Sequence, residues 1–316
     1  MKVLVTGANG FVGRGLLVGL RRDMRVVPIA LVRDQMSDVV DGVEIRVSGA
    51  LEAQEPCTGI LDGIDVIVHL AARAHMLDEP DADPLETFRR VNVEGTLRLA
   101  HQAAEAGVRR FVFVSSIGVN GNQTTSPFSE SDMPHPHDAY TLSKYEAERG
   151  LLDISDQTGM EVVIIRPPLV YGANAPGNFG SLVTWVRKGV PLPLGAVRNQ
   201  RSLVALDNLV DFIALCADRE RSPKAANEVF LISDGEDVST SELLRKVAKA
   251  YGVRASLLPV PVGLMSFLAR ILGKGAVADR LFGSLQVDNS KARKLLGWRP
   301  VVTMDEALRR MVDCNG

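Results

Sequence analysis

The sequence predicts an α/β protein in which a doubly wound parallel sheet forms the first half and a smaller, mostly helical domain forms the C-terminal half. Short apolar runs alternate with helical patterns through the first half of the 316 residues. The runs are apolar at consecutive positions, as in Val66-Ile67-Val68, which suits parallel strands covered on both faces. The chain also opens with a strand, a glycine-rich turn and a helix.

The elements of the first half follow directly from this alternation. The predicted strands are 2–6, 25–32, 43–48, 65–70, 110–115 and 161–166, and the predicted helices lie near 11–22, 84–107 and 138–158. Regular alternation of this kind is typical of an open sheet whose crossover helices cover both faces.

The first turn has the spacing Thr6-Gly-x-x-Gly-x-x-Gly13. We expect Gly7 to allow a sharp turn, Gly10 to let backbone N–H groups approach a pyrophosphate, and Gly13 to let the helix pack closely on the strand. The pattern predicts a dinucleotide site in a Rossmann-like domain rather than an ordinary β-turn-α corner. The expected cofactor contacts in this turn are Gly7, Asn9, Gly10, Phe11, Val12 and Gly13.

The pattern changes after Arg166. Pro167 and Pro168 end the strand, and residues 172–200 are rich in Gly, Pro and Asn around one helix at about 178–189. A strand and helix at 203–217 and a strand at 229–232 are expected to rejoin the first domain. The resulting domains are residues 1–168 with 203–232, which bind the dinucleotide, and residues 169–202 with 233–316, which bind the substrate.

Composition narrows the classes of function. Hydrophobic residues make up 46% and charged residues 23%, as in globular proteins. The net charge of −2 gives no strong attraction to nucleic acid or acidic lipid, so no nucleic-acid partner is expected. The three cysteines form no C-x-x-C pair and the five histidines show no metal-ligand spacing, so we expect reduced thiols and no metal.

Targeting signals are not expected. No long apolar run follows Lys2, so the N-terminal residues predict a strand and not a signal peptide. No run approaches the ~20 apolar residues of a membrane span. Residues 260–272 come nearest, and Arg270 with the glycines after it favours a core or lid helix over a helix on a membrane surface. We expect a cytoplasmic protein.

Tyr140 and Lys144 are candidate catalytic residues, because residues four apart share one face of a helix. A neighbouring ammonium favours the phenolate, so we expect Lys144 to lower the pKa of Tyr140 from about 10 toward neutrality. Such a tyrosine can exchange a proton with an alcohol or ketone while a hydride moves. Ser116 follows a predicted strand and is placed either to hydrogen-bond the reacting oxygen or to cap a turn.

These residues, with further motifs, resemble the extended short-chain dehydrogenases/reductases of the nucleotide-sugar epimerase/dehydratase group. The resemblance runs from Lys2 to about Pro300. The motifs are Thr6–Gly13, His69-Leu-Ala-Ala72, Val91-Asn-Val-Glu-Gly-Thr96, Ser115-Ser116, Tyr140-x-x-x-Lys144, Arg166-Pro-Pro-Leu-Val-Tyr-Gly172, Arg201-Ser-Leu-Val204 and Asp288-Asn-Ser-Lys-Ala292 with Leu296-Gly-Trp298.

The resemblance implies a role for each matching residue. Tyr140 would be the acid/base, Lys144 would bond the nicotinamide ribose and tune Tyr140, and Ser116 would orient the substrate oxygen. Asn92 would bond backbone in the helix behind the site. The other implied cofactor contacts are Leu70, the backbone of Ala71 and Ala72 at the adenosine ribose, and Pro167 at the nicotinamide. The substrate's diphosphate would meet Asn178, Arg201 and, with a looser match in spacing, Arg280.

Arg33 departs from the pattern of NAD enzymes. It lies twenty residues after Gly13, where an acidic residue usually bonds the adenine ribose, and Asp34 comes one residue later. A guanidinium attracts a 2′-phosphate that a carboxylate would repel, so we favour NADP over NAD, with Asp34 on the ribose as the alternative.

A preference for NADP favours net reduction. Segments such as His69–His75 and Leu285–Asp288 also resemble bacterial O-antigen reductases, so the first hypothesis is an NAD(P)H-dependent reductase of the C4 keto group of a UDP-2-acetamido-2,6-dideoxy-4-hexulose, used in surface polysaccharide synthesis. The alternative is a UDP-hexose 4-epimerase (UDP-glucose or UDP-HexNAc) with tightly bound NAD. A third, non-enzymatic hypothesis is an NADP-sensing scaffold, against which intact Ser116, Tyr140 and Lys144 argue.

The resemblance also implies a homodimer. Relatives commonly pair the helices that correspond to 84–107 and 138–158. Ala100, Ala103 and Ala104 would suit such a helix contact, or would pack on the sheet.

Overall fold

The computed structural model describes residues 1–35, 39–50, 59–74, 83–273 and 275–313. In this part of the chain a seven-stranded sheet has the order β3-β2-β1-β4-β5-β6-β9, and all neighbours are parallel. The strands are β1 (Lys2–Thr6), β2 (Val27–Val32), β3 (Glu44–Val47), β4 (Val66–His69), β5 (Arg110–Val114), β6 (Glu161–Arg166) and β9 (Glu228–Leu231). The predicted doubly wound sheet is confirmed.

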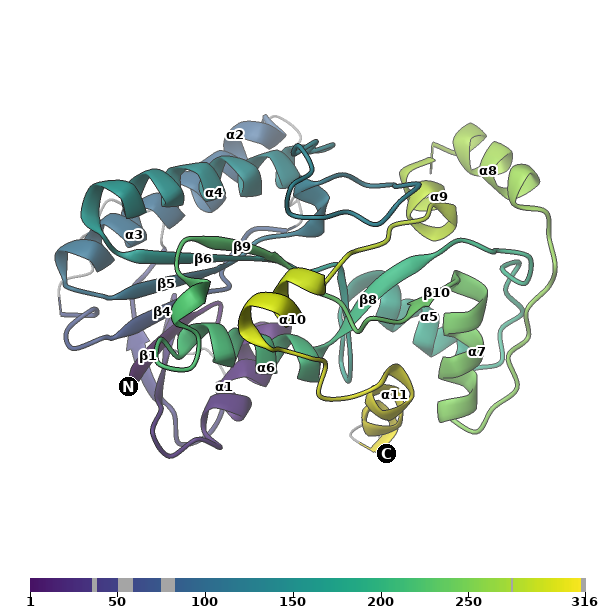
Figure 1. The fold of residues 1–316 in the computed structure, drawn as a ribbon. Coiled ribbons are helices and arrows are strands. Elements are labelled where there is room, and N and C mark those ends of the chain that lie inside the picture. Colours follow the sequence, from purple (N-terminus) through teal and green to yellow (C-terminus); the bar gives the residue numbers. More distant parts are fainter. Residues whose placement is uncertain (36–38, 51–58, 75–82, 274, 314–316) are drawn as a thin grey trace.

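Helices cover both faces of this sheet (Figure 1). One face carries α1 (Phe11–Leu20) and α6 (Leu206–Ala217), and the other carries α3 (Gly95–Glu105) and α4 (Ala139–Thr158). Successive residues of a strand point to opposite faces, so Val3 and Val5 belong to the first core and Leu4 to the second. Ala100 and Ala103 are fully buried in the second core, so these alanines pack on the sheet side of α3.

The single helix predicted over 84–107 is divided by a π-helical turn. After α2 (Pro84–Phe88), the chain forms the turn Arg89–Glu94 and then continues as α3. The side chain of Asn92 within this turn is buried and bonds to groups outside the helix. Turns of this kind are short insertions into α-helices that occur often at functional sites.

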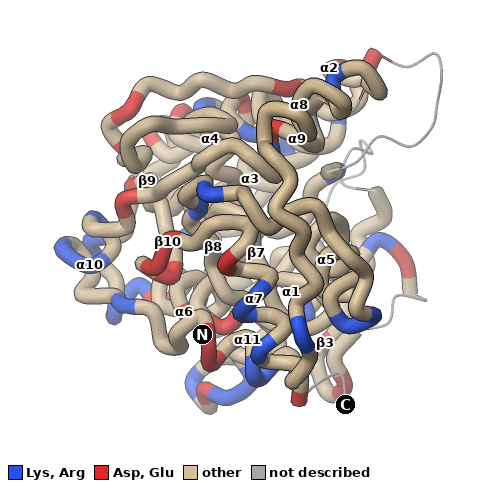
Figure 2. The backbone as a smooth tube through the Cα atoms, turned by 90° about the vertical axis from the view of Figure 1, so that its right-hand side faces the viewer, with Lys and Arg blue, Asp and Glu red and all other residues tan. Residues whose placement is uncertain are grey.

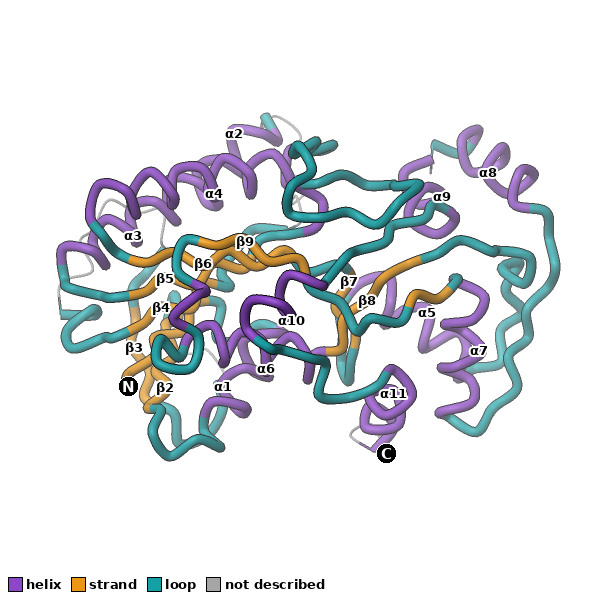
Figure 3. Tube along the Cα trace, in the orientation of Figure 1, coloured by secondary structure: helices purple, strands orange, loops and turns teal. Residues whose placement is uncertain are grey.

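A second, three-stranded sheet has the order β10-β8-β7 (Figure 3). It contains β7 (Leu169–Tyr171), β8 (Arg201–Ala205) and β10 (Asp237–Val238), with α5 (Gly177–Arg187), α7 (Thr240–Ala250) and α11 (Met304–Asp313) around a core of their own. The prediction that the strand near 203 rejoins the first domain is wrong, because β8 pairs with β7 and β10. Helix α6 packs on the large sheet, and the predicted return of the strand at 229–232 is confirmed, because β9 pairs with β6.

The side chains of β8 explain this position. Leu203 and Ala205 belong to the core of the small sheet, whereas Val204 belongs to the first core of the large sheet. A strand that is buried on both faces can therefore connect the two parts. The exact domain boundaries stay a prediction.

The remaining helices are α8 (Val262–Ile271), α9 (Gly275–Phe282) and α10 (Ser290–Leu296). For 260–272 we expected a core or a lid helix. The core alternative is wrong, because no residue of α8 is buried, and the lid alternative stays a prediction. Among the described residues, no helix is both long enough and apolar enough to cross a membrane.

Candidate active site

The glycine turn after β1 has the tight geometry that a dinucleotide needs. Gly7 has a φ of +64°, and a Cβ there would lie 2.8 Å from the backbone nitrogen of Ala71. A Cβ at Gly13 would collide with the carbonyl of Gly7, so only glycine lets α1 pack this closely on the turn. Gly10 is the N-cap residue of α1 and has no side chain to cap it, which leaves the first N–H groups of the helix available to an anion.

A cavity of about 450 Å³ opens beside this turn at the carboxyl ends of the strands. It includes seven residues named from the sequence: Gly7, Asn9, Gly10, Arg33, Leu70, Ala71 and Ala72. The strand order reverses between β1 and β4, and such a reversal is where open α/β sheets bind nucleotides. Arg33 is exposed and shares the cavity with Ser48, a position that sequence reasoning missed.

Phe11, Val12 and Gly13 do not line this cavity. Phe11 packs against the core of the small sheet, and Val12 packs against the first core of the large sheet. The side chains of Phe11 and Val12 therefore help to hold α1 in place.

Thr6 and His69 fix the two strand ends that flank the turn. The Thr6 hydroxyl lies 2.8 Å from Nδ1 of His69 and accepts from the N–H groups of Leu70 and Ala71, each at 3.1 Å. Nε2 of His69 lies 2.9 Å from the Thr96 hydroxyl. Burial, helped by the charge of Lys144, lowers the pKa of His69 to about 3, so the ring is neutral and structural.

Tyr140 lies in the first turn of α4. Asp138 caps this helix by accepting from the N–H of Thr141 at 2.7 Å, so the position of Tyr140 is set by a capping box. Ser116 caps a short 3₁₀ turn (Ile117–Val119) by accepting from the N–H of Gly118 at 3.1 Å. A Cβ on Gly118 would collide with Thr141, so this turn packs directly on the start of α4.

The pKa of Tyr140 moves in the opposite direction from the one expected. Burial raises the pKa of Tyr140 to about 12, and the Asp138 carboxylate adds to the rise. Lys144 is 2% exposed, and burial lowers its pKa to about 7 against the opposing effect of Glu148. The cost of burying the ammonium therefore limits how far Lys144 can acidify the tyrosine, and Lys144 itself becomes the group that titrates near neutrality.

Lys144 lies against an aromatic ring, next to a buried ion pair on the same helix. Its Nζ lies 4.1 Å from the centroid of the Phe113 ring. One helical turn further, the Glu148 carboxylate pairs with Arg166 at 2.5 Å, with both side chains at most 5% exposed. Arg166 also donates to Asn120 at 2.9 Å, so this ion pair ties α4 to β6 behind the site.

Asn92 has a different partner from the one implied by the resemblance. Its amide exchanges hydrogen bonds with the backbone of Arg73 at 2.8 and 3.1 Å and donates to the Ser143 hydroxyl at 3.0 Å. Asn92 therefore joins the segment after β4 to α4, and its backbone partner Arg73 lies in that segment and not in a helix.

The structure brings together two of the three predicted diphosphate contacts. Arg201 donates to the carbonyls of Arg280 at 2.8 Å and Gly283 at 3.1 Å. Burial and the positive charge of Arg280 lower the pKa of Arg201, as expected where two guanidinium groups converge. Asn178 lies exposed in the first turn of α5, and Pro167 is buried after β6, where its carbonyl accepts from the N–H of Ile117 at 3.0 Å.

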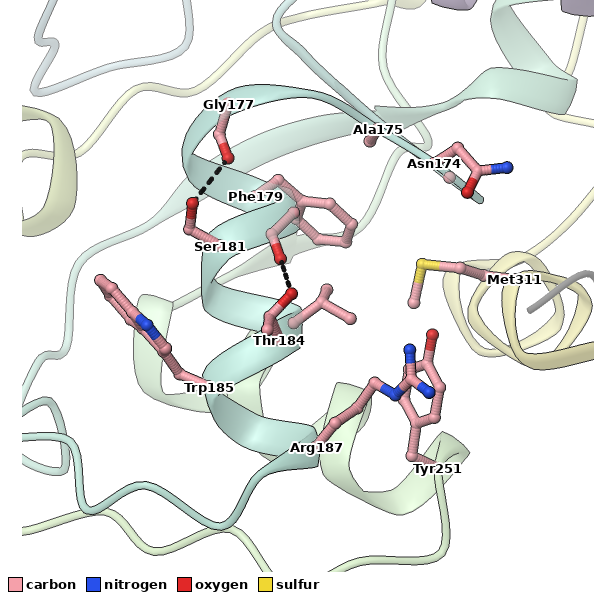
Figure 4. Close-up of a pocket in the computed structure, with 13 residues that line it drawn as sticks. Asn174, Ala175, Gly177, Phe179, Ser181, Thr184, Trp185, Arg187, Tyr251 and Met311 are labelled. Carbon is pink, nitrogen blue, oxygen red and sulfur yellow. Dashed lines mark hydrogen bonds between the residues drawn. The ribbon is translucent and has the colours of Figure 1, made fainter. Parts of the chain in front are cut away.

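A second cavity, of about 550 Å³, lies between α5, Tyr251 and Met311 (Figure 4). Ser181 and Thr184 donate their hydroxyl protons to backbone carbonyls of α5, and the Arg187 guanidinium lies 5.0 Å from the centre of the Tyr251 ring. These two hydroxyls are therefore used within α5, and no predicted site residue lines the cavity. Among the described residues, no group of three His, Cys, Asp or Glu could hold a metal ion.

Comparisons with known proteins agree with this arrangement. A family model described as the NAD dependent epimerase/dehydratase family matches residues 3–232. A UDP-glucose 4-epimerase of Vibrio cholerae is 44% identical over 98% of this chain and 93% of its own. The solved UDP-N-acetylglucosamine 4-epimerase of Bacillus cereus has a TM-score of 0.80 at 22% identity and covers 100% of both chains. The UDP-glucuronic acid 4-epimerase of Bacillus cereus, solved with NAD, has a TM-score of 0.80 at 21% identity over 99% of this chain and 96% of its own.

Proposed function

The chain belongs to the NAD-dependent epimerase/dehydratase family, and on this basis we propose that it is a UDP-hexose 4-epimerase that keeps NAD bound. The identity of 44% to a UDP-glucose 4-epimerase along almost the whole chain carries this proposal. It supports the alternative considered from the sequence better than the C4 reductase, and a role in surface polysaccharide synthesis stays a prediction.

The residues around the glycine turn fit a dinucleotide. The cradle formed by Gly7, Gly10 and the backbone of Ala71 has no room for a Cβ at Gly7, and α1 presents uncapped N–H groups beside it. When bound, NAD supplies a reversible hydride acceptor at its nicotinamide. The glycine turn would hold the pyrophosphate, and Ala71 and Ala72 would contact the adenosine ribose.

The chemistry assigned to the chain's own side chains is proton transfer. Tyr140 would take the proton of the sugar 4-hydroxyl and return it to the same oxygen, and the Ser116 hydroxyl would donate a hydrogen bond to that oxygen. A tyrosine with a pKa of about 12 needs a nearby positive charge to act as a base. Lys144, with its pKa of about 7, gains that charge near neutrality.

Arg201 and Arg280 are the proposed diphosphate contacts. The positive charges of Arg201 and Arg280 repel each other, and Arg201 is largely withdrawn from water. A bound anion would offset this repulsion. We expect Arg201→Met to raise KM for UDP-glucose by about 10- to 100-fold with a smaller effect on kcat, since a charged hydrogen bond is lost. Steady-state kinetics measure this split, with Arg187→Met at the second cavity as a matched control. A loss confined to kcat would contradict the assignment.

Arg33 supports the second candidate, an NADPH-dependent reductase. It is exposed and lines the cavity beside the glycine turn, where it can meet a ribose 2′-phosphate. If the epimerase proposal is correct, the purified protein releases NAD when it is denatured. The Arg33→Ser variant should then contain NAD within about twofold of the wild-type amount, because no 2′-phosphate is bound. Chromatography of the released nucleotide measures this content. Release of NADP, with loss of NADP binding in Arg33→Ser, would favour the reductase instead.

A further inference from the structure

Helix α8 has an apolar surface that the described residues do not cover. None of its ten residues is buried, and Leu264, Phe267 and Ile271 are 52%, 61% and 66% exposed. Its only charged residue is Arg270, in the last turn. Val262 and Met265 pack against the core of the small sheet, so the uncovered side of α8 is the one that carries Leu264, Phe267 and Ile271. An exposed apolar patch of this kind marks an interaction site.

This surface lies at the outer end of the molecule (Figure 1). Figure 2 views the molecule from this end, and the tube of α8 is mostly tan there. Leu272 and Val277, 70% and 45% exposed, extend the apolar area from α8 toward α9. We call α8, Leu272 and α9 the apolar end.

The apolar end is firmly attached to the substrate side of the protein. The carbonyl of Leu281, in the last turn of α9, accepts from the Thr240 hydroxyl at 2.7 Å and from the Asn199 amide at 3.1 Å. The carbonyl of Arg280 accepts from Arg201. Helix α9 is thus anchored, and α8 packs against it on the outside.

Charge distinguishes the possible occupants. The described residues of α8 and α9 carry two cations, Arg270 and Arg280, and one anion, Asp279, although the whole chain has a net charge of −2. In a symmetric contact between two copies, the same patch meets itself, so these positive charges would face each other. An anionic lipid surface would instead attract them.

Length determines how α8 can meet a lipid. Ten helical residues span about 15 Å, half of the hydrocarbon core of a bilayer. A helix of this length, apolar with a cation at its end, lies in the plane of the interface with its side chains among the acyl chains.

We propose that the apolar end docks the protein on an anionic membrane surface, with Phe267 and Ile271 inserted and Arg270 at the headgroups. Docked in this way, α9 and the paired Arg201 and Arg280 lie next to the membrane. This proposal does not depend on the sugar chemistry proposed above.

The test is co-sedimentation of the full-length protein with vesicles of equal parts phosphatidylglycerol and phosphatidylcholine, compared with phosphatidylcholine alone. Wild-type protein should bind the anionic vesicles, less at high salt. The double variant Phe267→Glu/Ile271→Glu should bind about tenfold less, and Arg270→Glu about fivefold less. The matched control is Met24→Glu, which changes another exposed apolar residue, 95% exposed, and should bind like wild type.

Thermal unfolding of each variant checks that it folds. Equal binding of wild type to the two kinds of vesicle, or unchanged binding of the double variant, would overturn the proposal. Light scattering tests a second copy of this chain as the alternative occupant. If wild type forms a dimer that the double variant does not form, and neither binds vesicles, the apolar end is a dimer contact.

Discussion

Replacing Tyr140 with phenylalanine should lower kcat for sugar interconversion by about 10²- to 10⁴-fold, because the change removes the group that exchanges the proton of the sugar hydroxyl. The ring stays in place against Phe88, whose centroid lies 6.0 Å away, so folding should be unaffected. Binding of UDP-glucose should stay within about twofold of wild type. Single-turnover kinetics and calorimetric titration measure the two quantities separately.

Tyr145 provides a matched control for this variant. It lies on the same helix, and Tyr145→Phe removes the same hydroxyl from a tyrosine that bonds to Arg149 and not to the site. We expect near wild-type turnover for Tyr145→Phe. Equal losses of turnover and binding in Tyr140→Phe, or equal losses of turnover in the two variants, would contradict the acid/base role.

Replacing Arg166 with methionine should have the largest effect on stability. Its guanidinium makes hydrogen bonds to Glu148 and to Asn120 in a setting where both charged side chains are at most 5% exposed. Removing one partner of a buried pair leaves the other charge without compensation, which costs about 3–5 kcal/mol. Urea unfolding followed by circular dichroism measures this loss.

Two further variants make this prediction specific. The double variant Arg166→Met/Glu148→Met removes both charges and should recover much of the lost stability, because replacing a buried pair with apolar residues is often close to neutral. Arg25→Met breaks the exposed pair with Asp23 and should leave the unfolding midpoint almost unchanged. A single variant as stable as Arg25→Met would contradict the account.

The large sheet and the glycine turn could be predicted because local patterns determine them. Continuous apolar runs identify buried parallel strands, and the spacing of Gly7, Gly10 and Gly13 identifies the turn before α1. Both signals lie within a few residues of the elements they describe, so neither depends on distant parts of the chain.

The errors concern features that depend on distant partners. β8 has the apolar pattern of any buried strand, and only its pairing with β7 and β10 places it in the small sheet. The π turn at Asn92 depends on bonds to Arg73 and Ser143. The exposure of α8 and the raised pKa of Tyr140 both depend on how tertiary packing buries each of them. The spacing of residues in the sequence does not reveal this packing.

The preference for a reductase over an epimerase rested on Arg33 and on segments that resemble O-antigen reductases. Arg33 predicts affinity for a 2′-phosphate, and its exposed side chain lines the cavity beside the glycine turn. The 44% identity to a UDP-glucose 4-epimerase extends over 98% of the chain, far more than these sequence features, and it favours the epimerase.

The most direct test of the epimerase is turnover without added cofactor. Purified protein is incubated with UDP-glucose and, separately, with UDP-N-acetylglucosamine, and the 4-epimers are separated by chromatography. We expect at least one substrate to convert to an equilibrium mixture of 4-epimers, with no net oxidation of NADPH when it is added. No interconversion of either sugar, together with stoichiometric oxidation of NADPH by a UDP-4-keto-6-deoxy-HexNAc, would contradict it.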